Sequence, residues 1–264
     1  MACNCIVIVR EVWDTRDLVG QVLGPDGRLN DKGLTTRFEP EDLNSLEQAL
    51  QLKDKQGGKV TVISLGPTRN VDVLRESLFR GVDEAIRLAA PAGAALDTAA
   101  QAEMCAAAIR KLGNYQLVLV GVTVPEGENS LLGAEIAARL GHAESSYVDG
   151  LVAVDATGVV VKRAIEMGFE HVRLDFPAVL CVGVSLVKDD PRTPRSAKAM
   201  LKLKLKKAEV PEWTAASLGL NGLAAKVTLT GYVAVPQRQI KTRQVDPEDA
   251  GALKAMLADV LGGR

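Results

Sequence analysis

Short apolar runs alternate with longer amphipathic stretches along the first half of the sequence, and this alternation restricts the possible folds more than any other feature. Unbroken apolar runs are expected for strands of a sheet that helices cover on both faces. Such runs predict strands at residues 5–9, 59–65, 84–88 and 117–122. The intervening stretches predict helices at residues 40–55, 71–80, 97–112 and 130–140. We therefore expect an α/β fold with a doubly wound, mostly parallel sheet.

The pattern changes after about residue 145, where strand signals follow one another without helices. Alternating runs at residues 150–154 and 158–163 flank the turn sequence Asp-Ala-Thr-Gly and predict a hairpin. Further strand-like runs lie at residues 171–174 and 178–184. Together these runs predict antiparallel strands added to the edge of the parallel sheet.

The last quarter of the chain has a different character. Residues 210–245 have few helix signals, and we expect them to extend away from the core. Residues 246–261 open with Asp-Pro-Glu-Asp, which favours the first turn of a helix. The sequence thus predicts a main α/β domain over residues 1–209 and an extended C-terminal arm with a helix over residues 210–264.

The charge and the aromatic content exclude bulk nucleic-acid binding. The chain has 32 Lys and Arg against 33 Asp and Glu, a net charge of −1, so it is not expected to coat nucleic acid. Aromatic residues make up only 3%, which argues against a platform that stacks single-stranded bases.

Cysteine and histidine usage points to a reducing compartment without a metal site. The cysteines Cys3, Cys5, Cys105 and Cys181 lack the spacing of a disulfide scaffold and are interpreted as buried free thiols. With only His142 and His171, the usual nitrogen-rich metal sites are not expected. No N-terminal apolar run is long enough for a signal peptide or a membrane span, so we expect a cytoplasmic protein.

Loops at the ends of predicted strands form the candidate ligand site. The loop at residues 121–130 precedes a helix and presents Asn129 or Ser130 as its cap. Backbone N–H groups at such a helix start favour a phosphate, although a plain capped helix is the alternative interpretation. Loops at residues 38–42 and 63–67 are expected at the same edge, where α/β sheets bind ligands.

Motifs of common enzymes are missing from the sequence. It contains no G-x-G-x-x-G motif, no Walker A motif and no nucleophile elbow. No residue is identified as a catalytic acid, base or nucleophile. A binding or carrier protein is therefore favoured over a hydrolase.

One segment is strongly basic. Residues 188–207 contain eight Lys or Arg against two Asp, a local net charge of +6. Lysines alternate with leucines at its end, which suits an amphipathic strand or a docking segment. A solvated face or a nucleic-acid patch is the alternative interpretation.

Several short motifs, in order over some 230 residues, resemble the β subunit of electron transfer flavoprotein. Residues 9–15 resemble the family's opening Val-Lys-Gln-Val-Pro-Asp-Thr, and residues 39–50 resemble its Asn-Pro-x-Asp helix start. Residues 126–133 stand where the family has Asp-Gly-Asp-Thr-Ala-Gln-Val-Gly. Residues 161–179 resemble the signature region, and residues 236–238 match the C-terminal arm.

The resemblance implies a Rossmann-like, adenine-nucleotide-binding fold and an electron carrier subunit rather than a stand-alone enzyme. Such a β subunit forms a heterodimer with an α subunit, which holds most of an FAD near the β surface. Electrons pass between a dehydrogenase and a downstream quinone reductase or ferredoxin-type acceptor. The family's β subunit holds AMP in the ordinary branch and a second FAD in the electron-bifurcating branch. Asp14-Thr15 and Asp97-Thr98 resemble the bifurcating branch, so we predict FAD with AMP as the alternative.

The resemblance also implies the site residues. The predicted cofactor-binding residues are Ile8, Val9, Arg10, Glu39, Asp42, Ser64, Leu65, Gly66, Asp97, Thr98, Glu126, Gly127, Glu128, Asn129, Ser130, Leu131, Leu132 and Gly133. The predicted partner-docking residues are Arg192, Arg195, Ser196, Lys198, Met200, Leu201, Lys202 and Lys204. The C-terminal arm is expected to contact the α subunit.

The sequence departs from the family at several of these positions. Glu126 and Glu128 replace aspartates, Glu39 replaces an asparagine, and Ser196-Ala197 replaces a Leu-Pro pair used in docking. The competing interpretation is a ligase of the ATP-pyrophosphatase type on a related fold. Such a ligase needs a Ser-Gly-Gly-x-Asp-Ser loop after its first strand, which residues 9–13 do not supply.

Overall fold

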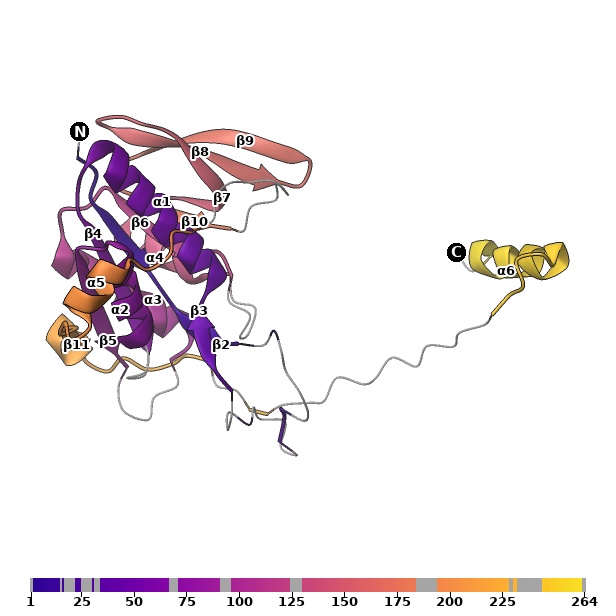
Figure 1. Ribbon diagram of the computed structural model, residues 1–264, viewed down its shortest axis with the longest axis horizontal. Helices are drawn as coiled ribbons and strands as arrows, with labels where there is room; N and C mark the ends of the chain where they lie inside the picture. The colour runs from indigo at the N-terminus through magenta and orange to yellow at the C-terminus, as the bar shows by residue number, and fades with distance from the viewer. Residues whose placement is uncertain are drawn as a thin grey trace. The chain divides into compact units, whose positions relative to one another are not determined.

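The computed structural model of the chain divides into two compact units (Figure 1). It describes residues 2–14, 16, 22–24, 30, 34–66, 71–90, 96–123, 130–183, 194–227, 230–231 and 244–262. The main unit comprises Met1–Val22 and Asp31–Leu229, and the smaller one Leu23–Asn30 and Thr230–Arg264. The functional division after residue 209 stays a prediction.

A nine-stranded sheet forms the centre of the main unit. In order across the sheet, the strands are β11 (Glu212–Thr214), β5 (Glu84–Ala89), β4 (Val60–Gly66), β1 (Cys5–Ile8), β6 (Leu117–Gly121), β10 (Ala178–Val182), β7 (Ala143–Val154), β8 (Gly158–Ile165) and β9 (Gly168–Asp175). Neighbours from β11 to β7 pair in parallel, whereas β7, β8 and β9 pair antiparallel. The predicted parallel sheet with antiparallel edge strands is confirmed.

Strand β10 differs from its predicted place among the added antiparallel strands. It lies inside the sheet and pairs in parallel with both β6 and β7. All five of its residues are buried, as expected for a strand that helices cover on both faces. Because an apolar run carries no information on strand direction, the sequence pattern could not place it.

Helices cover both faces of the sheet and confirm the doubly wound arrangement. Helices α1 (Pro40–Gln56) and α2 (Val71–Arg80) pack on one face, and α3 (Thr98–Leu112) and α4 (Leu132–Leu140) pack on the other. Successive strand residues point to opposite faces. In β1, Val7 therefore joins the cluster beneath α1, and Ile6 and Ile8 join the cluster beneath α3.

Local sequence explains most helix ends. Glu39 caps α1 and Pro40 occupies its first turn, where a missing N–H costs nothing. The Asp97 side chain caps α3 by accepting a hydrogen bond from the N–H of Ala100 at 2.9 Å. The predicted cap of α4 is wrong, because Leu131 occupies that position without a side-chain cap. Asn129 lies outside the described residues.

Part of the predicted arm returns to the sheet. Strand β11 pairs with β5, and a 3-10 helix, η2 (Ala216–Leu218), follows it. Trp213, Leu218 and Leu220 pack against the apolar cluster beneath α3. The expectation that this stretch extends away from the core is thus wrong for its first residues. A three-residue strand is too short to show periodicity in the sequence.

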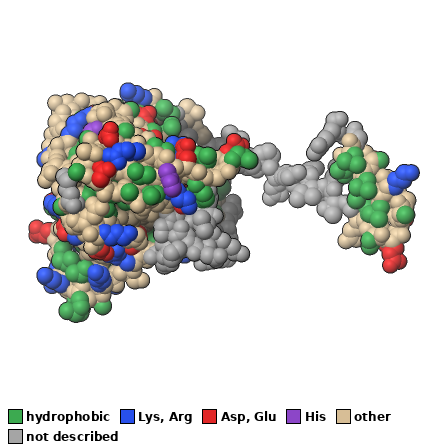
Figure 2. Space-filling view, turned by 90° about the horizontal axis from the view of Figure 1, so that it is seen from above, with side chains coloured by type: hydrophobic (Ala, Val, Ile, Leu, Met, Phe, Trp, Pro, Cys, Tyr) green, Lys and Arg blue, Asp and Glu red, His purple; other side chains and the backbone are tan. Residues whose placement is uncertain are grey.

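The smaller unit contains the predicted C-terminal helix. This helix, α6, spans Ala250–Gly262 and exposes the apolar side chains of Leu257, Val260 and Leu261. Figure 2 shows hydrophobic side chains gathered on its surface. Among the described residues, no helix is long and apolar enough to cross a lipid bilayer.

Gly133 allows α4 to lie close to the sheet. A Cβ at this position would lie 2.1 Å from Cys181 Sγ and 2.9 Å from Val120 Cγ1. We predict that Gly133→Val pushes α4 off the sheet and lowers the free energy of unfolding by about 1–3 kcal/mol, measured in urea. The matched test compares Gly133→Ala with the double variant Gly133→Ala/Cys181→Ala. Removing the sulfur should restore part of the free energy of unfolding that Gly133→Ala loses. Equal stability of Gly133→Val and the parent would contradict this packing.

Candidate functional site

The strand order reverses between β1 and β6, which is the switch point of the sheet. After β1 the chain forms β4 and β5 on one side, and then crosses to form β6 on the other side of β1. The connections therefore diverge at this point, and the carboxyl ends of strands at a switch point are where α/β sheets typically bind ligands. Arg10 follows β1 and Gly121 ends β6, so both lie at this edge.

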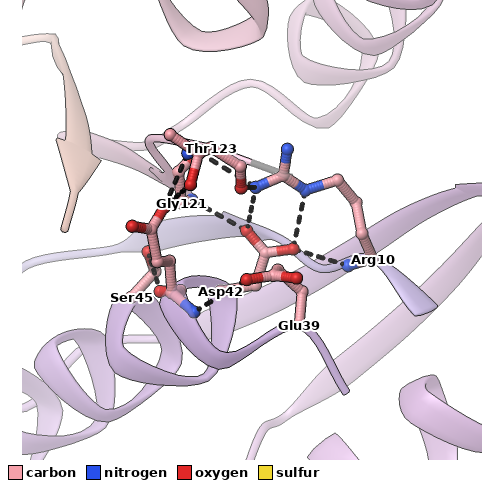
Figure 3. Close-up of polar contacts among 7 residues, drawn as sticks. Arg10, Glu39, Asp42, Ser45, Gly121 and Thr123 are labelled. Atoms are coloured by element: carbon pink, nitrogen blue, oxygen red, sulfur yellow. Dashed lines mark hydrogen bonds and ion pairs between the residues drawn. The ribbon is translucent and has the colours of Figure 1, made fainter. Parts of the chain in front are cut away.

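The Asp42 carboxylate is the centre of the site, and it is fully buried (Figure 3). Its Oδ2 accepts hydrogen bonds from the backbone N and from Nε of Arg10, both at 2.8 Å. Its Oδ1 accepts from Arg10 Nη2 at 2.7 Å and from the N–H of Gly121 at 2.8 Å. Burial lowers the pKa of Arg10, but the charge and hydrogen bonds of Asp42, together with the charges of Glu39 and Glu41, outweigh burial and raise this pKa overall.

The same arginine and the first turn of α1 hold the end of β6. Arg10 Nη2 also donates to the carbonyls of Gly121 at 3.0 Å and Thr123 at 3.1 Å. The Thr123 N–H and hydroxyl both donate to Glu41 Oε2, at 2.6 and 3.1 Å. Three segments that are distant in the sequence therefore meet in one hydrogen-bonded network (Figure 3).

Gly121 is required by this close approach. A Cβ there would lie 2.6 Å from Asp42 Oδ1 and 2.8 Å from Arg10 Nη2. Any side chain would therefore displace the ion pair. The position is a place where backbone and buried charges come together, which is a typical use of glycine.

Glu39 adds a buried acid that lacks a cation of its own. It is 3% exposed, and its Oε1 accepts from the N–H of Glu41 at 3.3 Å. Within the described residues, Glu39 Oε2 and Arg10 Nη1 are buried without hydrogen-bond partners. Burial, together with the charge of Asp42, raises the pKa of Glu39 to about 7. The switch point thus holds two buried polar atoms without hydrogen-bond partners among the described residues, which is unusual for buried polar groups.

Other predicted cofactor residues lie at the same edge but use their side chains differently. Ile8 and Val9 are buried in opposite apolar clusters, which leaves their backbone as the polar part. Ser64, Leu65 and Gly66 end β4, next to β1. At α4, Leu131 is 61% exposed, whereas Leu132 and Gly133 are buried. Of the predicted loop, Glu126, Gly127, Glu128 and Asn129 lie outside the described residues, and Ser130 lies just before α4.

Asp97 and Thr98 are not part of the network around Asp42. Besides capping α3, Asp97 accepts from the N–H groups of Lys226 at 2.6 Å and Val227 at 2.9 Å. The N–H of Ala100, followed by those of the other two residues, lowers the pKa of this carboxyl despite partial desolvation. Asp97 thus holds the chain that follows η2. A contact between Asp97 and a cofactor stays a prediction.

Glu41, Gly121 and Thr123 lie in the loops that the sequence predicts at this edge, but they are not among the predicted cofactor-binding residues. Arg10 and Asp42 are predicted as separate cofactor contacts, whereas the structure pairs them with one another. The acidic first turn of α1 beside a lone arginine at the end of β1 was the available signal. Only the crossing of the chain at the switch point brings these groups together.

The basic segment forms a short helix, α5 (Ala199–Leu205), rather than the amphipathic strand weighed above. Helical spacing turns Leu201 and Leu205 toward the protein, whereas Met200 and Leu203 are each 78% exposed. Ser196, Lys198, Lys202 and Lys204 are exposed as well. Arg195 instead turns inward and pairs with Glu47, and Arg192 lies outside the described residues.

Fold and site together define an α/β protein with a doubly wound sheet and a buried ion-pair network at its switch point. A family model described as "Electron transfer flavoprotein domain" matches residues 26–218. The proteins named electron transfer flavoprotein subunit beta from Thermoanaerobacterium thermosaccharolyticum and Clostridium acetobutylicum are 33% and 35% identical to this chain. They align over 86% and 85% of this chain and 87% and 86% of their own lengths. Protein FixA of Azorhizobium caulinodans is 30% identical over 97% of this chain and 93% of its own length.

The chain belongs to the electron transfer flavoprotein beta subunit family, and its role is in electron transfer. The resemblance of the sequence motifs to this family is thereby confirmed. Family membership also decides against the ligase interpretation.

We predict that Glu39 makes stability depend on pH. Its folded-state pKa of about 7 lies above the ordinary 4.5, so the folded state binds this proton more tightly than the unfolded chain. This contribution is complete below pH 4.5 and is lost as the pH rises to about 7. Glu39→Gln keeps the cap but removes the titration. The free energy of unfolding of this variant minus that of the parent should therefore be up to about 3 kcal/mol higher at pH 8 than at pH 4.

Urea unfolding across this pH range measures the difference. Glu166→Gln, at an exposed hairpin turn, is the control. A parallel pH dependence of Glu39→Gln and the parent would show that Glu39 does not titrate in this range.

Proposed function

We propose that this chain is the beta subunit of a heterodimeric electron transfer flavoprotein and binds an adenine nucleotide in the switch-point crevice. With an α subunit it helps to pass electrons between a dehydrogenase and a quinone reductase or ferredoxin-type acceptor. The observation that supports the nucleotide site is that Arg10 Nη1 and Glu39 Oε2 are buried there without hydrogen-bond partners in the part of the chain that the structure describes. The C-terminal arm is proposed to contact the α subunit. The cytoplasmic location stays a prediction.

The residues of the crevice suit the two ends of a nucleotide. Glu39 can accept from a ribose hydroxyl or an adenine amino group, or donate when it is protonated. Across the crevice, α4 starts without a side-chain cap, and its positive dipole end favours a phosphate. Ser130 and Leu131 are the described residues that lead into this helix start. A mixed site of this kind fits a ligand that carries both hydroxyl groups and phosphates.

We propose FAD as the nucleotide of this chain, with AMP as the alternative. The motifs around Asp14 and Asp97 support FAD through their resemblance to the bifurcating branch. A bound flavin would itself supply the redox chemistry, and the chain would position it and shape its electrostatic surroundings.

Nucleotide stoichiometry tests this proposal. After denaturation of the purified heterodimer, we expect two FAD per αβ pair, quantified by absorbance and chromatography. One FAD with one AMP would overturn the FAD assignment and keep the site. Asp42→Asn should release the nucleotide of this chain only, because it breaks the buried pair that shapes the crevice. If neither nucleotide is lost from Asp42→Asn, the proposed crevice is wrong.

The exposed face of α5 is proposed as the surface that docks an electron-transfer partner. Met200 and Leu203 form an apolar pair, and lysines at positions 198, 202, 204, 206 and 207 surround it. Such a surface suits a partner with an apolar depression in an acidic rim, since complementary charge steers association.

We expect Lys202→Glu to slow electron transfer with the dehydrogenase by about tenfold at low ionic strength, with a smaller effect at high salt. Lys55→Glu, an exposed lysine near the end of α1, changes the net charge equally and should have little effect. Stopped-flow rates over a salt series measure both variants. Equal slowing by the two substitutions would assign the effect to net charge and not to α5.

A further inference from the structure

Arg195 is held inside the protein although it lies in the basic segment. Its backbone N–H donates to Glu47 Oε2 at 2.9 Å, and its Nε donates to the same oxygen at 3.0 Å. Its Nη2 donates to Glu47 Oε1 at 3.1 Å, and Nη1 pairs with Asp54 Oδ2 at 2.8 Å. Both carboxylates belong to α1. Two carboxylates of the same helix therefore pair with the guanidinium.

Helix α2 holds the same segment from the other side. Arg80 Nη1 donates to the carbonyl of Arg195. The N–H of Lys198, the residue that precedes α5, donates to the carbonyl of Phe79 at 2.8 Å. The four residues before α5 are therefore tied to both helices that cover this face of the sheet.

Glu47 is suited to hold a charge pair in place. It is 7% exposed, and a further donor, Gln51 Nε2, reaches its Oε1 at 3.1 Å. Burial raises the pKa of Glu47, but the hydrogen bonds from Arg195 and Gln51, together with the charge of Arg195, outweigh burial and lower this pKa overall. The carboxylate is thus charged at neutral pH. Because charge-assisted bonds with several donors restrict geometry, this contact fixes both position and direction.

Helix α1 also carries the crevice at its other end. Asp42 lies in its first turn and holds Arg10, and Glu47 follows five residues later, about 7.5 Å further along the axis. One rigid helix therefore contacts both the switch point and the segment that leads into α5. Elements held by helices keep more exact positions than those held by loops.

We infer that Arg195 is a positioning residue: with Glu47 and Asp54 it fixes the docking helix α5 relative to the crevice at the start of α1, and it is not itself a contact for the partner. This inference rests on the proposed docking role of α5. It replaces the sequence-based assignment of Arg195 to the docking surface. The partner then meets Met200, Leu203 and the exposed lysines only.

We call the contacts of Arg195 with Glu47 and Asp54 the clamp. Amide hydrogen exchange of the full-length chain tests the clamp without any partner. We expect Arg195→Gln and Glu47→Gln each to raise exchange of the amides of residues 195–207 about tenfold, because either change frees the segment to open locally. The double variant should show no further rise, since both substitutions remove the same interaction. Arg195→Lys, which keeps the charge with fewer donors, should restore part of the protection.

Arg139→Gln is the matched control, because Arg139 pairs with two carboxylates, Glu103 and Glu135, on the opposite face of the sheet. It should leave residues 195–207 unchanged. Unchanged exchange in Arg195→Gln, additive effects of the two clamp variants, or an equal rise in the control would each overturn the inference. Failure of the Lys202→Glu prediction with an intact exchange result would instead overturn the docking role and leave the clamp.

Discussion

The buried Asp42 carboxylate accepts four N–H hydrogen bonds, and the arrangement of the site depends on them. They join the end of β1, the first turn of α1 and the end of β6, across separations of 32 and 79 residues. Desolvation cancels most of the attraction in a buried ion pair, so such a pair contributes more to geometry than to stability. Here it holds the two strand ends of the switch point at a set distance from α1.

The same network determines how the acids at the switch point are paired. The acids Glu39, Glu41 and Asp42 lie near one arginine, and Asp42 accepts hydrogen bonds from the backbone N, Nε and Nη2 of this arginine. Glu41 accepts hydrogen bonds from Thr123. Burial, together with the charge of Asp42, raises the pKa of Glu39. A family member with asparagine at this position would have no such titration. The departure at residue 39 therefore adds a titratable group at the switch point.

Helix α1 connects the two functions proposed for the chain. Its first turn lies at the proposed nucleotide site, and Glu47 and Asp54 hold the segment before α5. The distance over which electrons pass depends on how a partner is placed, so a docking helix needs a fixed relation to the cofactor. Two charge clusters on a single helix provide this relation with few residues. The exposed lysines of α5 are then left to the partner.

The sequence by itself determined the strands and helices of the doubly wound core, because unbroken apolar runs and helical spacing are local properties of the chain. Through short ordered motifs it also determined the family. The parallel direction of β10, the pairing of β11 with β5 and the helical form of the basic segment were decided by the tertiary structure. The same holds for the partners of charged residues. Arg10 and Arg195 look like available cations in the sequence, but folding places a buried carboxylate beside each, and desolvation makes that contact obligatory.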